Sequence, residues 1–263
     1  MDALLPLIGK IGTIVIKTST NSISFVPQLH YTINEGNGKA HFPLLLNSLV
    51  GLVKASPISF WRFYMLLTRF TAENALREAE AANPGPWADH ARYVAQACEN
   101  IALRCPHLDA DDAYIYGILH DIGRYAGVTS EKHLIDGYRY CQERDWEKAA
   151  QICISHAFMV KDISSSIGVF DMPQEDKDFM EQFVKDAVYD DYDLLVQLCD
   201  ALALPSGFCL LEKRFVDVAI RYGTHPATID RWKAVLAIKA HFEEIIGCSI
   251  YDLLPGVVEN SFR

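Results

Sequence analysis

The feature that most constrains this chain is a polar pair at the end of an apolar run. Residues 116–124 have the sequence YGILHDIGR, in which His120 and Asp121 follow side chains that belong in a protein interior. Burial of an ionised carboxylate is costly unless a counter-charge or a cation accompanies it. A metal ion is the simplest partner for both side chains, and the C-terminal end of a helix before Gly123 would favour that cation further.

His120 and Asp121 need ligands from other parts of the chain. Adjacent residues on a helix point about 100° apart and cannot hold one ion as residues four apart do. Asp200 is the clearest further candidate, because it is the only acidic residue in the otherwise apolar segment 194–204. A metal ligand is favoured there over the alternative, which is a structural ion pair within the core.

Three histidines extend this candidate set. His90 lies on the apolar face of a predicted helix, His133 lies four residues before Gly137, and His156 ends the apolar run 149–155. Gly137 would allow another helix to approach closely. Taken singly, each histidine also fits a structural role, so their assignment as ligands depends on the whole set.

Apolar residues recur with a helical period from Thr71 onward, and no convincing strand follows residue 65. The body of the chain is therefore predicted to be all-α. Side-chain caps are expected from Asp109 for the helix that ends in the His-Asp pair, and from Thr129 or Ser130 for the next helix. The predicted helices cover residues 71–82, 86–104, 110–121, 130–143, 145–156, 173–188, 192–204, 208–222 and 226–246.

Residues 1–64 differ in character from the rest. Short β-prone runs, such as residues 12–17 and 22–26, alternate with turns rich in Asn and Gly, without a helical period. An extension with no independent fold is favoured over a small accessory β segment, and Met65 fits an alternative start. We predict two parts, an N-terminal extension of uncertain fold up to residue 64 and a helical domain over 65–263.

Composition and charge restrict the class of partner. The chain has 263 residues, half of them apolar, as in ordinary globular proteins. Its net charge is −10; residues 1–64 carry +3, which leaves −13 for residues 65–263. An acidic body argues against nucleic acid as a partner, but it allows a small phosphorylated substrate if metal ions reverse the local charge.

The spacing of the cysteines and the length of the apolar segments indicate where in the cell the protein is expected. The seven cysteines form no CxxC pair, which indicates reduced thiols and a cytoplasmic protein. No apolar run reaches the roughly 18–20 residues that cross a bilayer, and the first residues lack the basic start of a signal peptide. We therefore expect neither export nor a membrane partner.

The order of His90, the His120 and Asp121 pair, and Asp200 resembles the H…HD…D pattern of the HD-domain metal-dependent phosphohydrolase superfamily. Residues 120–123 also match its HDIG variant. The resemblance covers well over half of the chain. It implies an HD-domain helical bundle that cleaves phosphate esters or anhydrides with divalent metal ions.

Within this superfamily, His133 with Gly137, and His156 after its apolar run, resemble the bacterial HD-domain diadenosine tetraphosphate hydrolases, which bind two ions. By this resemblance Asp121 bridges the two ions. The ligands implied for the first ion are His90, His120, Asp121 and Asp200, and those implied for the second are His133, His156 and Asp121.

The chemistry of this ligand set agrees with the resemblance. Imidazole and carboxylate ligands without thiolates suit two divalent ions such as iron or manganese. A pair of ions about 3.5–4 Å apart can hold a bridging hydroxide that attacks phosphorus. Asp121, as the bridge, and Asp200, as a ligand that helps to deprotonate the nucleophile, are the expected catalytic residues. The expected ligands of substrate phosphate are Arg124 and Lys161, ahead of the weaker candidates Arg139, Lys213 and Arg214.

The predicted function is that of a phosphohydrolase acting on a small phosphorylated substrate, for which a nucleotide is favoured. Two alternatives remain. A single-metal nucleotidase would use His133 and His156 to bind substrate phosphate instead of a second ion. A non-catalytic HD module would bind a nucleotide or a protein partner without turnover.

Overall fold

The computed structural model describes residues 18–19, 22–23 and 66–262. In the N-terminal region, strands β1 (Thr18–Ser19) and β2 (Ser22–Ile23) pair antiparallel. Strand β2 falls within the predicted β-prone run 22–26, whereas the other predictions for residues 1–64 lie outside the described residues. The second compact unit of the chain contains the described residues 66–262.

This second unit is built almost entirely of helices, as the all-α prediction requires. Helix α5 packs against α6, and α7 packs against α8. The helices are α4 (Arg69–Ala82), α5 (Trp87–Ala102), α6 (Ala110–Leu119), η1 (Ile122–Ala126), α7 (Lys132–Gln142), α8 (Glu147–Ser155), η2 (Ile163–Ser165), α9 (Gln174–Asp186), α10 (Asp191–Ala201), α11 (Leu211–Tyr222), α12 (Thr228–Ile246), η3 (Ile250–Leu253) and α13 (Val257–Ser261).

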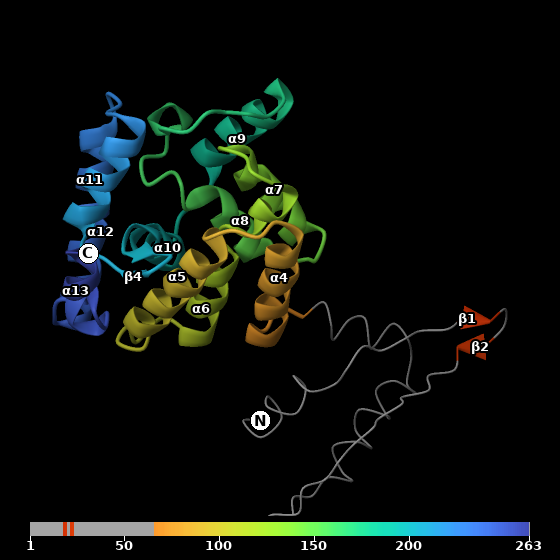
Figure 1. Ribbon diagram of the computed structural model, residues 1–263, viewed down its shortest axis with the longest axis horizontal. Helices are drawn as coiled ribbons and strands as arrows, with labels where there is room; N and C mark the ends of the chain where they lie inside the picture. The colour runs from red at the N-terminus through yellow and green to blue at the C-terminus, as the bar shows by residue number, and fades with distance from the viewer. Residues whose placement is uncertain (1–17, 20–21, 24–65, 263) are drawn as a thin grey trace, which may run out of the picture. The chain divides into compact units, whose positions relative to one another are not determined.

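Helix α10 occupies the centre of this body. It packs against α5, α6 and α8 on one side and against α11 and α12 on the other. Figure 1 shows it between the α5–α6 pair and the C-terminal helices. Leu195, Val196, Leu198 and Cys199 on α10 are fully buried, so the apolar character of segment 194–204 follows from this central position.

The predicted C-terminal end of the helix over residues 192–204 is wrong. The helix expected to continue to residue 204 ends at Ala201, and a hairpin of strands β3 (Ala203–Leu204) and β4 (Gly207–Phe208) follows. Two residues explain why a hairpin replaces the last turn of the predicted helix. Pro205 does not continue a helix, and Gly207 takes a φ of 137°, which a residue with a side chain rarely adopts.

Two glycines let neighbouring elements approach within backbone contact. A Cβ on Gly117 of α6 would lie 2.7 Å from the Ala95 Cα on α5. A Cβ on Gly123 of η1 would lie 2.0 Å from the His133 carbonyl oxygen and 2.3 Å from the Gly137 nitrogen on α7. The prediction that another element approaches at Gly137 is therefore confirmed, and α6 with η1 is enclosed between α5 and α7.

The N-terminus of α6 is capped by a neighbouring residue, whereas that of α7 is capped by a residue distant in sequence. The Asp109 side chain accepts hydrogen bonds from the first turn of α6, as predicted. The predicted cap of α7 is wrong for both residues: Thr129 Oγ1 has no hydrogen-bond partner among the described residues, and the Ser130 hydroxyl accepts from the Val169 nitrogen. The Asp171 carboxylate caps α7 instead, because it accepts hydrogen bonds from the backbone nitrogens of Ser130 and Lys132, each at 2.8 Å.

Candidate metal centre

The His-Asp pair lies where one helix type changes to another. His120 is the C-cap residue of α6, and Asp121, with φ −105° and ψ 16°, is the N-cap residue of the 3₁₀ helix η1. Both are buried, with 1 % and 5 % of their surface exposed. The α-helix thus ends before Asp121, so the 100° separation of adjacent helical residues does not apply, and His120 Nε2 lies 3.8 Å from Asp121 Oδ2.

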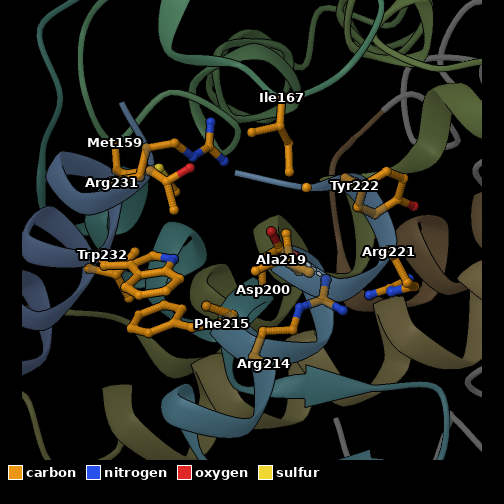
Figure 2. Close-up of a pocket in the computed structure, with 15 residues that line it drawn as sticks. Met159, Ile167, Asp200, Arg214, Phe215, Ala219, Arg221, Tyr222, Arg231 and Trp232 are labelled. Carbon is orange, nitrogen blue, oxygen red and sulfur yellow. Dashed lines mark ion pairs between the residues drawn. The ribbon is translucent and has the colours of Figure 1, made fainter. Parts of the chain in front are cut away.

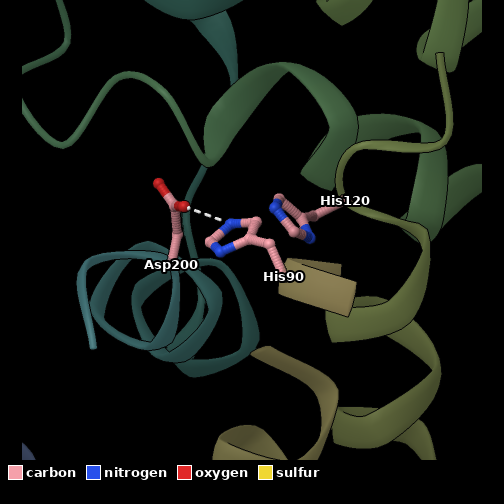
Figure 3. Close-up of side chains that lie close together, drawn as sticks. All are labelled: His90, His120 and Asp200. Carbon is pink, nitrogen blue, oxygen red and sulfur yellow. Dashed lines mark hydrogen bonds and ion pairs between the residues drawn. The ribbon is translucent and has the colours of Figure 1, made fainter. Parts of the chain in front are cut away.

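Helices α5 and α10 add His90 and Asp200. His90 Nε2 lies 2.9 Å from Asp200 Oδ1, and the His90 and His120 rings are 5.4 Å apart (Figure 3). One donor atom from each of His90, His120 and Asp200 lies within 4.8 Å of the other two. These three residues come from three separate helices and form the first group of metal-binding donors.

Helices α7 and α8 bring the remaining two histidines to Asp121. Its Oδ1 lies 3.0 Å from His133 Nε2 and 3.7 Å from His156 Nε2. His120, Asp121 and His156 form a second group of donors within 4.8 Å of one another. The fold therefore gathers all six residues predicted as metal ligands into one cluster.

The Nδ1 atoms of three histidines are engaged by the backbone. Hydrogen bonds join His120 Nδ1 to the Gly117 carbonyl at 2.7 Å and His156 Nδ1 to the Ile152 carbonyl at 3.0 Å. His133 Nδ1 likewise donates to a carbonyl, that of Ser130. An imidazole that donates through Nδ1 carries its lone pair on Nε2, which is the form that binds a metal.

Two buried atoms in the cluster lack hydrogen-bond partners among the described residues. They are His120 Nε2 and Asp121 Oδ1. An imidazole that donates through Nδ1, as His133 does to Ser130, turns a lone pair and not a proton toward Asp121 Oδ1 at 3.0 Å. Unpaired buried polar atoms are costly, and a cation would satisfy both of these. The donor set, four imidazoles and two carboxylates without thiolate, fits divalent transition metals.

Charges within the cluster hold both carboxylates in the ionised form. Burial would raise the pKa of Asp121, but the charge of Arg124 and the nearby His120 and His133 lower it well below the usual range. Burial would likewise raise the pKa of Asp200, yet the hydrogen bond and charge of His90 lower it. Burial lowers the pKa of His120 to about 4. Ionised carboxylates and neutral imidazoles are the protonation states that metal binding needs.

The predicted phosphate ligands lie in different environments. Arg124 is half-buried, and its Nε donates to Asp121 Oδ2 at 2.6 Å. Lys161 is exposed, donates to the Ala187 carbonyl and lies over the Tyr189 ring, so it is not part of the cluster. Of the weaker candidates, Arg139 pairs with Asp176, Lys213 pairs with Asp217, and Arg214 Nη2 lies 3.8 Å from Asp200 Oδ1.

Sequence reasoning missed two residues near the cluster. Asp193 on α10 is fully buried and accepts hydrogen bonds from Ser155 on α8, at 2.6 Å, and from Gln151. It joins the helices that carry His156 and Asp200. Its position at the edge of the apolar segment was a usable signal. Arg231 on α12 lines a cavity beside Asp200, and nothing in the sequence around it indicated this.

Comparison with known proteins agrees with this geometry. Residues 87–204 match the family model of the HD domain. This HD segment contains all six clustered residues, and the match supports the HD-domain superfamily. Comparison with curated proteins and with solved structures found no match. Within the described part of the chain, no helix has the length and apolarity needed to cross a membrane.

Proposed function

We propose that the chain is a metal-dependent phosphohydrolase of the HD type. One observation carries the proposal: the HD segment brings four histidines and two aspartates together, with the buried His120 Nε2 and Asp121 Oδ1 forming no hydrogen bond among the described residues. A purely structural cluster would have no reason to leave such atoms without partners.

The six residues divide into two sets of ligands in this proposal. Asp121 would belong to both sets, because its Oδ2 lies 3.8 Å from His120 Nε2, whereas its Oδ1 faces His133 and His156. The first set is His90, His120, Asp121 and Asp200; the second set is His133, His156 and Asp121. Divalent ions held there would supply Lewis acidity and an activated water.

The protein's own groups would position the substrate. Arg124 pairs with Asp121 at the edge of the cluster, where a phosphate group could take the place of part of that contact. Asp200 has a lowered pKa, so it serves better as a ligand that orients water than as a proton acceptor. Among the described residues, Lys161 contacts the Ala187 carbonyl and the Tyr189 ring, and its phosphate-binding role stays a prediction from sequence.

The finer assignments belong to the same proposal. The substrate is a nucleotide, two ions bind, and the ligand pattern is that of the bimetallic diadenosine tetraphosphate hydrolases. The protein is cytoplasmic and acts without nucleic acid. Residues 1–64 form an extension and 65–263 the catalytic domain.

A single-metal enzyme is the second candidate. Neither of the two three-donor groups found among residues 66–262 includes His133, and both groups share His120. One ion centred on His120 would leave His133 and His156 free to contact phosphate. Metal stoichiometry separates the two candidates, because one ion per chain with both histidines intact contradicts the two-ion assignment.

The test is metal analysis of the purified chain together with a phosphate-release screen over nucleotides with added manganese, iron or cobalt. Two ions per chain and release from a nucleotide are expected. His133→Ala should reduce metal content, whereas His241→Ala should not, because His241 is exposed and pairs with Asp191 outside the cluster. Tight nucleotide binding without release under any ion would favour the non-catalytic module.

A further inference from the structure

A cavity of about 220 Å³ opens beside Asp200, largely outside the HD segment. Most of its wall comes from α11 and α12, which follow residue 204 (Figure 2). Its most chemically distinctive lining residues are Asp200, Arg214, Phe215, Arg221, Arg231 and Trp232.

The cavity and the metal centre share one carboxylate. Asp200 Oδ1 lies 2.9 Å from His90 Nε2 on the side of the metal centre and 3.8 Å from Arg214 Nη2 on the side of the cavity. A group bound beside Arg214 is therefore a neighbour of any group that reacts at the cluster. The two spaces can hold adjacent parts of one molecule.

The cavity is positively charged in an acidic protein. Three arginines line it, Arg214, Arg221 and Arg231, against the single carboxylate of Asp200, whereas the chain as a whole carries −10. In Figure 2 the three guanidinium groups are spread around the space. Such an arrangement attracts an anion.

Arg231 is held by neutral hydrogen-bond acceptors and not by a carboxylate. Its Nη1 donates to the carbonyls of Ala157 at 3.3 Å and Ser165 at 3.2 Å. These neutral acceptors fix the guanidinium in place without cancelling its charge. Within residues 66–262 it forms no ion pair, and Glu131 and Asp200 attract it only from longer range. Its other nitrogens are suited to a bidentate contact with phosphate.

An apolar wall strengthens this electrostatic effect. The rings of Phe215 and Trp232 stack with their centroids 5.1 Å apart and their planes 8° apart. They line the same cavity as Arg214 and Arg231. A wall that excludes water on one side makes the attraction between a guanidinium and an anion stronger than it is in water.

We propose that Arg214 and Arg231 bind a second phosphate of the substrate, next to the phosphate that reacts at the metal centre. The substrate class is then one with at least two neighbouring phosphates, such as a nucleoside diphosphate or a longer phosphoanhydride. A simple phosphate monoester would leave this site empty. The inference rests on the proposed phosphohydrolase function.

The test is calorimetric titration of the metal-loaded full chain with imidodiphosphate, which resists hydrolysis, and with inorganic phosphate. Metal content is measured before and after titration, because a diphosphate can extract metal. We expect imidodiphosphate to bind at least about tenfold more tightly than phosphate. Arg231→Gln should abolish this preference, and Arg231→Lys should retain part of it.

The matched control is Arg77→Gln, which removes an exposed arginine on α4 that donates to Asn74 and should leave the preference unchanged. If Arg231→Gln does not fold, Arg214→Gln carries the test. The inference is overturned if the wild-type chain shows no preference, or if Arg231→Gln and Arg214→Gln both keep it.

A different result is expected if the proposed phosphohydrolase function is wrong. In that case the wild-type chain binds no metal and releases no phosphate in the nucleotide screen. The same titration of the metal-free chain then decides the inference, since loss of imidodiphosphate binding in Arg231→Gln would still support the anion site, and unchanged binding would exclude it.

Discussion

Asp121 is the side chain on which both proposed ions depend. Its carboxylate lies within 4 Å of three histidines and one arginine. Asp121→Ala removes the bridging ligand and leaves cations and Arg124 without a counter-charge. We expect both ions to be lost and phosphate release to fall by about 100-fold or more.

Elemental analysis and circular dichroism of the folded variant check this result. The matched control is Asp176→Ala, which removes an acidic residue paired with Arg139 outside the cluster and should retain both ions. Full metal content in Asp121→Ala would show that the ligand assignment is wrong.

Substitution of His156 should remove only one of the two proposed ions. Its Nε2 faces Asp121 Oδ1, whereas the group of His90, His120 and Asp200 is complete without it. His156→Ala is therefore expected to reduce the metal content from two ions to one per chain. Elemental analysis measures the ratio directly. Loss of both ions in a folded variant would mean that the two sites do not bind independently.

At the scale of elements, α7 depends on a cap supplied from another segment. Asp171 accepts hydrogen bonds from the backbone nitrogens of Ser130 and Lys132, one residue before the metal-ligand candidate His133. Asp171→Ala should lower the free energy of unfolding by about 1 kcal/mol. It should also weaken binding of the ion assigned to His133 more than binding of the first ion. Chemical denaturation and metal titration measure the two effects.

The same cap has a defined pH dependence. Burial would raise the pKa of Asp171, but the hydrogen bonds from the Ser130 and Lys132 backbone lower it below the ordinary value. A carboxylate with a lowered folded-state pKa stabilises the fold above its unfolded pKa of about 3.9, and this contribution is lost as the pH falls through the folded value. The stability difference between wild type and Asp171→Ala should therefore shrink below about pH 4. A constant difference down to pH 2 would contradict the role of the ionised cap.

The contact between η1 and α7 depends on a residue without a side chain. A Cβ on Gly123 would lie 2.0 Å from the His133 carbonyl oxygen, and backbone atoms cannot rotate away as side chains do. Gly123→Ala should lower the free energy of unfolding by at least about 2 kcal/mol. It should also separate Asp121 from His133 and reduce binding of the second ion.

Ala126→Ser is the control for Gly123→Ala, because Ala126 lies exposed on the same 3₁₀ helix. It should change stability little. Thermal unfolding monitored by circular dichroism compares the two variants. Equal stability of Gly123→Ala and wild type would mean that η1 and α7 can separate at no cost.

For the whole molecule, bound metal should act as a cross-link between helices. The six candidate ligands come from α5, the junction of α6 with η1, α7, α8 and α10, which are close together only in the folded chain. Ligands that bind the folded state alone stabilise it by about 2.7 kcal/mol at a hundred times the dissociation constant. Removal of metal with a chelator should therefore lower the midpoint of thermal unfolding. An unchanged midpoint in a chain shown to contain metal would contradict this geometry.

Several features of the whole fold were predictable because their causes are local. Helical periodicity predicted the all-α body, and the Asp109 side chain capped α6 as expected, since a cap contacts residues only two or three positions away. The candidate ligands were predictable for a different reason. A histidine or aspartate in an apolar segment carries a desolvation cost that requires a partner, and this held for Asp121 and Asp200.

Other features depended on contacts between distant segments, which residue spacing does not reveal. Asp171 caps α7 from a loop about forty residues away, so the predicted cap at Ser130 was wrong. Lys161, although close in sequence to His156, turns toward Ala187. The hairpin after Ala201 replaces a predicted helical turn.

The sequence by itself determined the helical class through periodicity and pointed to Asp121 and Asp200 through the cost of desolvation. The four histidines were assigned as ligands through the resemblance to the HD-domain superfamily. Only the tertiary structure decided which side chains share a site. The packing of α11 and α12 against α10 brings Arg214 and Arg231 to the cavity beside Asp200. That position follows from how whole helices pack, and no pattern of neighbouring residues around Arg231 encodes it.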